Sequence, residues 1–309
     1  MLRYIVRRVL FLIPVLLGVA FCVFTLLYLT PGDPARMVLG DLATEDAVQE
    51  FRNREGLNDP FLVQFGNYVW KAVTKSDIGR SYITKRSVAQ EVLAVFPATL
   101  KLSALAMLIA ILVGLPCGIL SAIKQYSLFD TVTMIFAMIG LSMPVFWLGL
   151  LLILLFSVHL RWLPSSGFGT FKAMILPAVS LSAQAISKVT RMTRSSMLEV
   201  IRADYIRTAR AKGQKEFVVI WVHALHNALI PVVTLCGLQF GHLLAGAILT
   251  ESIFAIPGIG RLMVSSIMQR NYPVVQGGVL FIAIAFSIVN LLVDLVYAYI
   301  DPRIKAQYK

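Results

Sequence analysis

The stretch VLFLIPVLLGVAFCVFTLLYLT, at residues 9–30, contains no charged side chain and decides the fold class of this protein. The hydrocarbon core of a bilayer is about 30 Å thick, so roughly 20 apolar residues in a helix cross it. Further runs of this kind lie at residues 97–122, 131–158, 175–197, 228–250 and 276–300. The sequence therefore predicts an all-α polytopic membrane protein with six transmembrane helices.

The composition agrees with this fold class. Of the 309 residues, 58% are hydrophobic and only 14% are charged, whereas soluble domains are about 25% charged. A soluble enzyme is excluded because the polar surface is too small to cover the protein in water. A disordered chain is excluded because so much apolar surface can be buried. The net charge of +12 fits the Lys and Arg excess of cytoplasmic membrane loops. No separate basic domain is present, so nucleic-acid binding is not expected.

The distribution of Lys and Arg predicts the orientation. They are concentrated before the first run and in the alternate short segments that would share its side of the membrane. The positive-inside rule then places both termini in the cytoplasm. We interpret the first run as a retained helix, because it is too long for a signal peptide and lacks a small-residue cleavage site. Gly114-Leu115-Pro116 and Met143-Pro144 predict kinks in the second and third helices.

The chain divides into four predicted parts: a cytoplasmic N-terminus with the first helix at 1–30, a periplasmic loop region at 31–96, a five-helix core at 97–300 that includes segment 199–226, and a cytoplasmic tail at 301–309. In the loop region, Thr44 is expected to cap a helix that begins with two acidic residues. An amphipathic helix is predicted at 61–73, with an apolar face of Phe61, Phe65, Tyr68, Val69 and Trp70. The region either shields the helix bundle or docks an outside partner.

Segment 199–226 is the second large polar part and is predicted to be cytoplasmic. Asp204 is expected to cap a short helix, and Gly213 to end it at the C′ position. A second short helix is predicted at 215–222. Helical spacing places four residues of the first helix on one face: Tyr205, Thr208, Ala209 and Lys212. This basic helix could rest on anionic lipid or contact a protein, and periodicity does not separate the two.

Motifs for catalysis are absent from the sequence. It contains no Walker-type phosphate loop, no H-E-x-x-H and no G-x-S-x-G, so no catalytic residue is predicted. His223 and His226 are three residues apart without nearby carboxylates or thiolates, which favours capping and interface roles over a metal site. Asp294 stands alone in the sixth run, and a structural pair with a base on another helix is favoured over an ion-pathway role. The bases of the fourth run, Lys188, Arg191 and Arg194, are expected to snorkel.

Two motifs around segment 199–226 carry a resemblance to a known family. DYIRTARAKG at 204–213, followed by HALHNALIP at 223–231, resembles the cytoplasmic signature of ABC-importer permeases, most closely the dipeptide/oligopeptide (peptide/nickel) permease family. The similarity runs from end to end through PGDP at 31–34, FPATL at 96–100, RSSMLE at 194–199, LTESIF at 249–254, PGIGR at 257–261, YPVVQ at 272–276, NLLVD at 290–294 and DPR at 301–303.

The general permease signature is EAA, three residues, Gly, nine residues and I-x-L-P. Arg207-Thr208-Ala209 occupies the EAA position and Gly213 the glycine, but Ile230-Pro231 lies farther from Gly213 than that spacing allows. The peptide-permease branch resembles this longer form. The departure leaves open which residues after Gly213 contact the partner.

The resemblance implies a multi-pass permease subunit of the bacterial inner membrane that is not itself an enzyme. It implies a second homologous permease subunit, two cytoplasmic ATPases (or a homodimer of one) that bind ATP and Mg, and a periplasmic or lipid-anchored binding protein. This chain would hold no cofactor and would supply half of an alternating-access pathway. The resemblance assigns ATPase coupling to Asp204, Tyr205, Arg207, Thr208, Ala209, Arg210, Ala211, Lys212 and Gly213.

Three functions stay open at this point. The first is a permease for di- or oligopeptides, and the second is the same machine for nickel chelates, glutathione or sugars, since the binding protein selects the cargo. The third is an autonomous channel or a membrane enzyme, which the absence of a charged filter and of catalytic groups disfavours. The segment at 204–213 distinguishes the two importer functions from the third, because a stand-alone channel would not need it.

Overall fold

The computed structural model describes residues 2–40, 42–75 and 77–300, and within them all side chains except those of residues 2–9, 294 and 296–300. The side chain of Asp294 and the tail at 301–309 therefore lie outside the described residues. The chain forms two compact units. We call Leu100–Ile256 with the stretch from Phe286 the bundle unit, and Ile5–Thr99 with Pro257–Ala285 the N-terminal unit.

The regular secondary structure of the described residues is helical, with no strand apart from a single bridge between Arg80 and Ser87. The N-terminal unit holds α1 (Leu2–Leu29), α2 (Pro34–Leu39), α3 (Glu45–Glu55), α4 (Phe61–Lys75) and α12 (Ile259–Met268). The bundle unit holds α6 (Leu128–Ser142), α7 (Val145–Leu152), η1 (Ile153–His159), α8 (Phe171–Ile201), α9 (Asp204–Ala211), α10 (Glu216–Val218), η2 (Val219–Ala224) and α11 (Leu225–Ile253). Two long helices, α5 (Val88–Ile123) and α13 (Tyr272–Ile300), contribute to both units.

The predicted membrane-spanning helices are confirmed. Within the described residues, five helical segments are long and apolar enough to cross a membrane, and Leu128–Ser142 with Val145–His159 is a sixth if the bent pair counts as one. The pair bends by 105° at Met143-Pro144, because proline lacks the N–H that would continue the helix. By contrast, α5 passes Pro116 as one helix.

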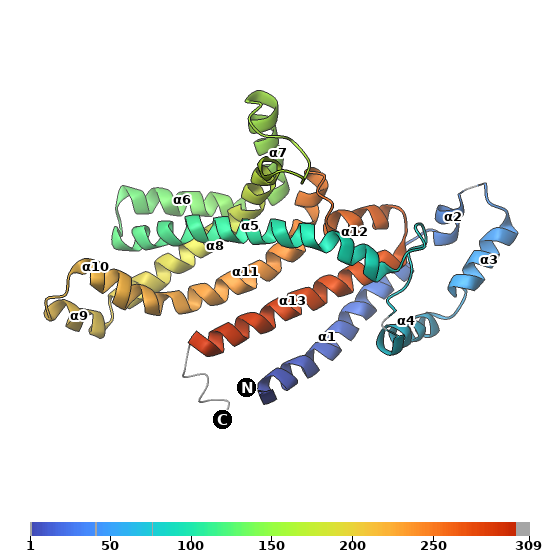
Figure 1. The fold of residues 1–309 in the computed structure, drawn as a ribbon, viewed down its shortest axis with the longest axis horizontal. Coiled ribbons are helices and arrows are strands. Elements are labelled where there is room, and N and C mark those ends of the chain that lie inside the picture. The colour runs from blue at the N-terminus through green and yellow to red at the C-terminus, as the bar shows by residue number, and fades with distance from the viewer. Residues whose placement is uncertain (1, 41, 76, 301–309) are drawn as a thin grey trace. The chain divides into compact units, whose positions relative to one another are not determined.

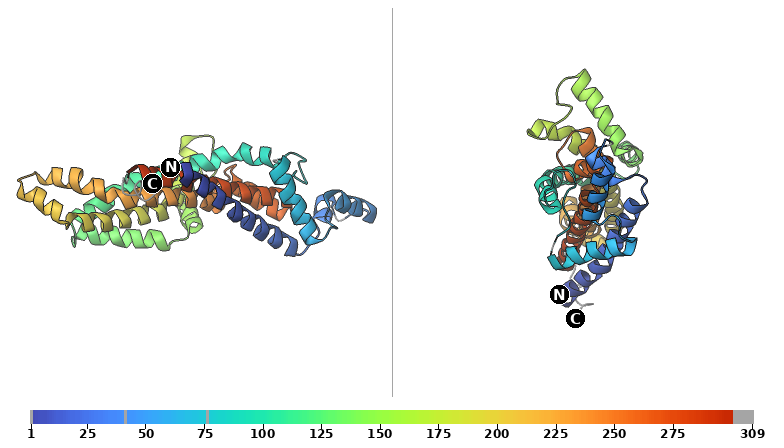
Figure 2. Two further views of the ribbon diagram at one scale, coloured as in Figure 1. Left: turned by 90° about the horizontal axis from the view of Figure 1, so that it is seen from below. Right: turned by 90° about the vertical axis from the view of Figure 1, so that its right-hand side faces the viewer.

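Helix α8 lies at the centre of the bundle unit and packs most extensively against α11 and α6 (Figures 1 and 2). Its buried positions are mostly small residues, Ala, Ser and Thr, which permit close approach of neighbouring helices. Gly114 and Gly118 of α5 face α8 so closely that a Cβ on Gly118 would lie 2.6 Å from the Thr190 carbonyl oxygen. This close contact supports α5 on both sides of Pro116.

We expect Gly118→Ala to lower the thermal midpoint of the purified protein. The added methyl group meets the Thr190 carbonyl oxygen and the Thr193 Cβ, each at 2.6 Å, and neither is the far end of a flexible side chain; overpacking of this kind costs about 1–3 kcal/mol. Gly246→Ala in α11 is the matched control, because a Cβ there meets nothing within 4 Å and alanine favours the helix. Equal midpoints for the two variants would contradict the close α5–α8 contact.

The loop region at 31–96 is folded within the N-terminal unit. Thr44 caps α3 as predicted, its hydroxyl accepting a hydrogen bond from the Ala47 N–H at 3.4 Å. The apolar face predicted for 61–73 is confirmed in part. The rings of Phe61 and Phe65 pack edge-on against Phe21 and Phe24 of α1, but Trp70 is 68% exposed because it lies on the opposite side of α4.

Candidate functional site

Helix α9 contains the residues that the resemblance singles out, and its C-terminal end matches the prediction. Gly213 has a φ of +76°, a left-handed conformation that favours glycine. Its N–H donates to the Arg210 carbonyl oxygen at 2.9 Å, and the Gln214 N–H donates to that of Ala209 at 3.3 Å. These two bonds form a Schellman motif, which satisfies carbonyls that the helix end leaves open.

The N-terminal end of α9 differs from the prediction. The N-cap residue is Ala203, and no side chain caps the helix. Asp204 is the first helical residue instead, with its side chain 97% exposed and 3.8 Å from the Arg207 guanidinium. Its carboxylate still lies at the positive end of the helix dipole. The predicted cap was wrong because the chain turns one residue earlier.

One residue of α9 is fully buried, and it fastens the helix to the bundle unit. Ile206 is 0% exposed and belongs to a cluster that we call the α9 socket. The socket comes from the ends of α5, α8 and α11 and from the turn before α11, and its buried members are Ile119, Ala122, Met197, Val219, Ile220, Ala224 and Ala228. Ile206 therefore packs in one cluster with residues of three long helices, α5, α8 and α11.

Two polar contacts add to this attachment. The Asn227 amide donates to the Tyr205 hydroxyl at 3.0 Å, and the Arg210 guanidinium donates two bonds to the Glu216 carboxylate, the shorter at 2.7 Å. The hydrogen bonds with Glu216 hold the pKa of Arg210 above its ordinary value. Both contacts join α9 to the residues that begin the next long helix.

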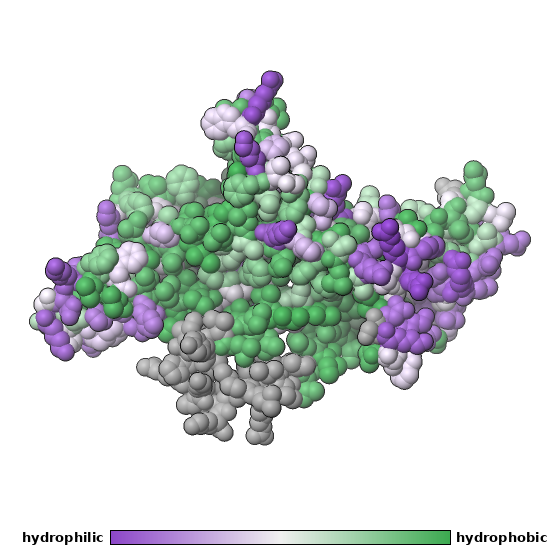
Figure 3. All heavy atoms as spheres, in the orientation of Figure 1, coloured by the Kyte–Doolittle hydropathy of each residue, from purple (hydrophilic) through white to green (hydrophobic). Residues whose placement is uncertain are grey.

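The residues to which the resemblance assigns ATPase coupling divide into two groups. Tyr205, Ala209 and Arg210 contact the protein. The others are exposed and form an outward surface of α9: Asp204, Arg207, Thr208, Ala211, Lys212 and Gly213. Figure 3 shows hydrophilic residues gathered over α9 and α10. The face expected from Tyr205, Thr208, Ala209 and Lys212 is therefore displaced, because Ile206 turns the helix toward its socket.

The second short helix predicted at 215–222 is not separate. Helix continues from Glu216 to Ile253, with a π-helical turn at Val219–Ala224. Such turns insert an extra residue into a helix without ending it. The socket residues Val219 and Ala224 are thus part of the same rod as α11, so α9 rests against one end of a long helix.

The structure corrects the snorkelling predicted for Arg194. Its guanidinium donates two hydrogen bonds to the Asp130 carboxylate of α6, at 2.6 and 2.7 Å. Asp130 also accepts from the Ser121 hydroxyl of α5 and, at 3.0 Å, from the Tyr126 N–H. The Asp130 side chain is only 5% exposed. A buried carboxylate needs such partners, and here they join α5, α6 and α8 beside the α9 socket.

Lys188 does not snorkel either. Its ammonium donates to the Gln239 amide oxygen of α11 at 3.1 Å. On the same side of α8, the Gln184 amide donates to the Met143 carbonyl oxygen at 3.3 Å, next to the break before Pro144. Sequence reasoning missed both contacts, although polar residues four apart in an apolar helix are a recognisable signal.

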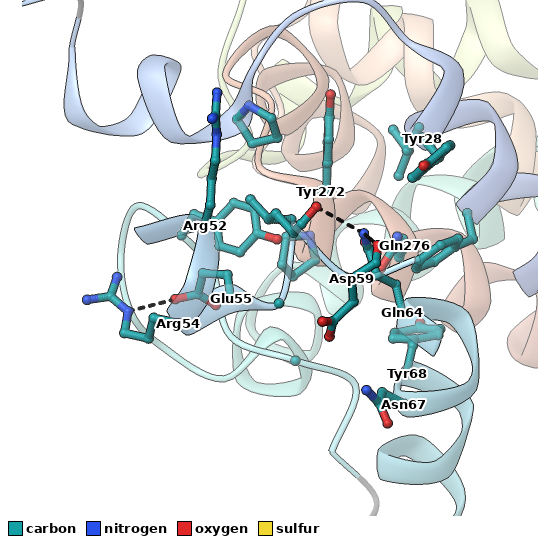
Figure 4. A pocket seen from close by; sticks show the side chains of 18 of the residues that line it. Tyr28, Arg52, Arg54, Glu55, Asp59, Gln64, Asn67, Tyr68, Tyr272 and Gln276 are labelled. Carbon is teal, nitrogen blue, oxygen red and sulfur yellow. Dashed lines mark hydrogen bonds and ion pairs between the residues drawn. The ribbon is translucent and has the colours of Figure 1, made fainter. Parts of the chain in front are cut away.

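The N-terminal unit contains a cavity of about 780 Å³, within the range of small-molecule sites. Figure 4 shows tyrosine rings and charged side chains around it. The Tyr68 hydroxyl is buried and has no hydrogen-bond partner among the described residues, and burial raises its pKa. Asp33 lies at the rim, where Arg52 donates to its carboxylate at 2.7 Å. Burial opposes ionisation of Asp33, but the bonds from Arg52 and the Ala35 N–H outweigh it and lower its pKa.

Motifs that are distant in the sequence meet in this unit. Gly32 of the PGDP motif has a φ of +116°, and a Cβ there would lie 2.5 Å from the Arg270 guanidinium carbon. The Ile259 N–H of the PGIGR motif donates to the Thr99 hydroxyl of FPATL at 2.9 Å. The motifs therefore stabilise the fold of the N-terminal unit.

Comparison with known proteins agrees with these features. Residues 114–306 match the family described as binding-protein-dependent transport system inner membrane component, and residues 1–103 match the N-terminal part of such components. The dipeptide transport system permease protein DppB of Alkalihalophilus pseudofirmus is 45% identical over 99% of this chain and 100% of the relative. The di/tripeptide transport system permease protein DppB of Pseudomonas aeruginosa is 44% identical with the same coverage.

Other relatives and solved structures are also similar. The glutathione transport system permease protein GsiC of Salmonella choleraesuis is 45% identical over 99% of both chains. An inward-facing MetNI methionine ABC transporter chain shares the fold, with a TM-score of 0.59, 18% identity, and coverage of 69% of this chain and 97% of that one. The chain therefore belongs to the inner-membrane components of binding-protein-dependent transport systems, as a non-catalytic multi-pass permease subunit of the dipeptide/oligopeptide branch of ABC importers.

Proposed function

We propose that this permease imports di- or oligopeptides, pairing with a second homologous permease to form the pathway. Two ATPase subunits would supply ATP hydrolysis with Mg, and a periplasmic or lipid-anchored binding protein would deliver the cargo. The two peptide-permease relatives, each similar over almost the whole chain, support this cargo. Glutathione, itself a short peptide, is the second candidate because GsiC is equally similar.

The ATPase contact is proposed to lie on the outward surface of α9. The main support is the burial of Ile206 in the α9 socket while Asp204, Arg207, Thr208 and Ala211 stay exposed on the same helix. A protein that pushes on this surface moves a helix attached to α5, α8 and α11 at once. We further propose that α9 and both termini face the cytoplasm, and that loop region 31–96 faces the periplasm and receives the binding protein.

Purification of the tagged protein from its native membranes in mild detergent with ATP tests this proposal. We expect a second permease and two ATPase chains to co-purify, and the reconstituted complex with its binding protein to transport a dipeptide on ATP addition. Glutathione in place of the dipeptide separates the two cargo candidates. Recovery of this chain alone, under conditions that keep a known ABC importer intact, would overturn the importer assembly.

We expect Gly213→Asp to abolish ATP-driven transport while leaving membrane insertion intact. A Cβ at Gly213 meets nothing within 4 Å, so the cost to the fold is only the left-handed backbone, about 1–2 kcal/mol. The carboxylate would, however, project from the proposed ATPase contact. Transport per ATP hydrolysed is the measurement.

Gly213→Asn is the matched control, because asparagine has the size of aspartate, tolerates the left-handed conformation and carries no charge. We expect it to retain most transport. Normal transport by well-expressed Gly213→Asp protein would count against the coupling role of this segment.

A further inference from the structure

Helix α8 has a polar face that the described residues of the bundle unit leave partly exposed. It consists of Gln184, Lys188, Arg191 and Ser195, spaced i, i+4, i+7 and i+11, and these residues fall within about 60° around a helix with 3.6 residues per turn. Gln184 and Lys188 are half-buried, and Arg191 and Ser195 are exposed. The name "polar face" is used below for these four residues.

The neighbouring helices pack on other sides of α8. Gly114 and Gly118 of α5 contact Val189, Thr190 and Thr193. Gly140 of α6 contacts Ser187 and Ala183. The polar face lies on another side of α8 from these glycine contacts and has two hydrogen bonds of its own: Lys188 donates to Gln239 of α11, and Gln184 donates to the Met143 carbonyl oxygen where α6 ends.

Lys188 lies deep along this helix. Seventeen residues separate it from Phe171 and thirteen from Ile201, which at 1.5 Å per residue is about 25 Å and about 20 Å. The hydrocarbon core is only about 30 Å thick, so a lysine at this position is costly unless it faces water or a charged group. A position facing lipid is therefore energetically unfavourable.

The chemistry of Lys188 fits an anionic ligand. Gln239 is 5% exposed and accepts one hydrogen bond from the ammonium through its amide oxygen. An ammonium has three donors, so this bond holds the group in place and leaves donors for a further acceptor. Arg191 lies one turn nearer to α9 and adds a second positive charge to the face.

We propose that the polar face of α8 lines the transport pathway and that Lys188, held by Gln239, binds the C-terminal carboxylate of the peptide as it passes. The inference rests on the proposed peptide cargo and assigns a binding residue for it within the membrane. A free carboxylate is the anionic group common to unmodified peptides, so one site serves cargoes with different side chains.

The test uses the complete reconstituted importer with the binding protein saturated with either a dipeptide or its C-terminal amide, so that the binding protein's own affinity does not enter. We expect Lys188→Met to slow transport of the free-carboxylate peptide roughly tenfold or more, because a charge-assisted hydrogen bond is lost. Transport of the amide should hardly change, and Lys188→Arg should retain transport of both. Lys172→Met, which removes an exposed lysine from the start of the same helix, is the control and should behave as wild type.

Assembly with the second permease and ATP hydrolysis are measured for each variant. Equal transport of the free-carboxylate peptide by Lys188→Met and wild type would overturn the proposal. Equal loss of both peptides, or loss of the second permease, would also overturn it by showing a structural role. If the assembled wild-type importer moves neither peptide, the peptide cargo itself fails, and this outcome is distinct from a failure of Lys188 alone.

Discussion

Asp130→Ala will strongly reduce the folded yield of this permease. The substitution leaves the Arg194 guanidinium, which is 23% exposed, without its carboxylate partner in the helix bundle. Removing one member of a buried ion pair costs about 3–5 kcal/mol, because the remaining charge stays desolvated. It also releases the Ser121 hydroxyl and the Tyr126 N–H, so the α5–α6 turn loses its connection to α8. Size-exclusion chromatography of the tagged protein in detergent measures the loss.

The double variant Asp130→Asn with Arg194→Gln is the control for this prediction. It removes both charges together but keeps groups that can hydrogen-bond across the same gap, so we expect it to recover a large part of the folded yield. If the single variant Asp130→Ala were as stable as wild type, the ion pair would not support the bundle unit.

Ile206→Ala is expected to detach α9 and to uncouple ATP hydrolysis from transport. Shortening a fully buried side chain to alanine costs about 2–5 kcal/mol. That amount is large for an eight-residue helix held by one buried side chain, the Tyr205–Asn227 bond and the Arg210–Glu216 pair. The loss should remain local, since the socket residues still pack against one another. Hydrogen exchange of residues 204–213 should speed up at least roughly tenfold, while the complex still hydrolyses ATP.

Arg207→Ala is the control that separates the attachment of α9 to its socket from the proposed docking of the ATPases on α9. The Arg207 side chain is 74% exposed and is not a member of the socket, so hydrogen exchange of α9 should stay at the wild-type rate even if coupling to the ATPases weakens. Unchanged exchange in Ile206→Ala protein would show that burial of this side chain does not hold α9, and the proposed transmission through the socket would then be wrong.

The sequence was informative wherever a feature depends on neighbouring residues. The membrane-spanning runs, the Thr44 cap, the glycine end at Gly213 and the bend at Pro144 all follow from periodicity or from backbone chemistry within one helical turn. Two local predictions were wrong. One placed a residue on the wrong side of a helix, and the other placed a helix cap one residue too late. Trp70 was assigned to the apolar face of α4 but lies on the opposite side of the helix and is exposed, and Asp204 lies inside α9 instead of capping it.

Segment 204–213, where we propose the ATPase contact, illustrates the limit of local patterns. Its helix, its end and its membership in the family signature could be read from residues 204–213. The side of α9 that faces the protein could not be read from this segment. It is set by the burial of Ile206, which depends on socket residues from Ile119 to Ala228.

By itself, therefore, the sequence determined the class of the protein and its spans, since the bilayer imposes length and polarity on each helix separately. Its resemblance to a permease signature predicts where the ATPases bind. Only the tertiary structure decided what the intramembrane charges do. Arg194 meets Asp130, 64 residues away, and Lys188 meets Gln239, 51 residues away. A buried charge takes the nearest complementary group in space, and which group that is depends on how α6, α8 and α11 pack, which no local pattern of residues specifies.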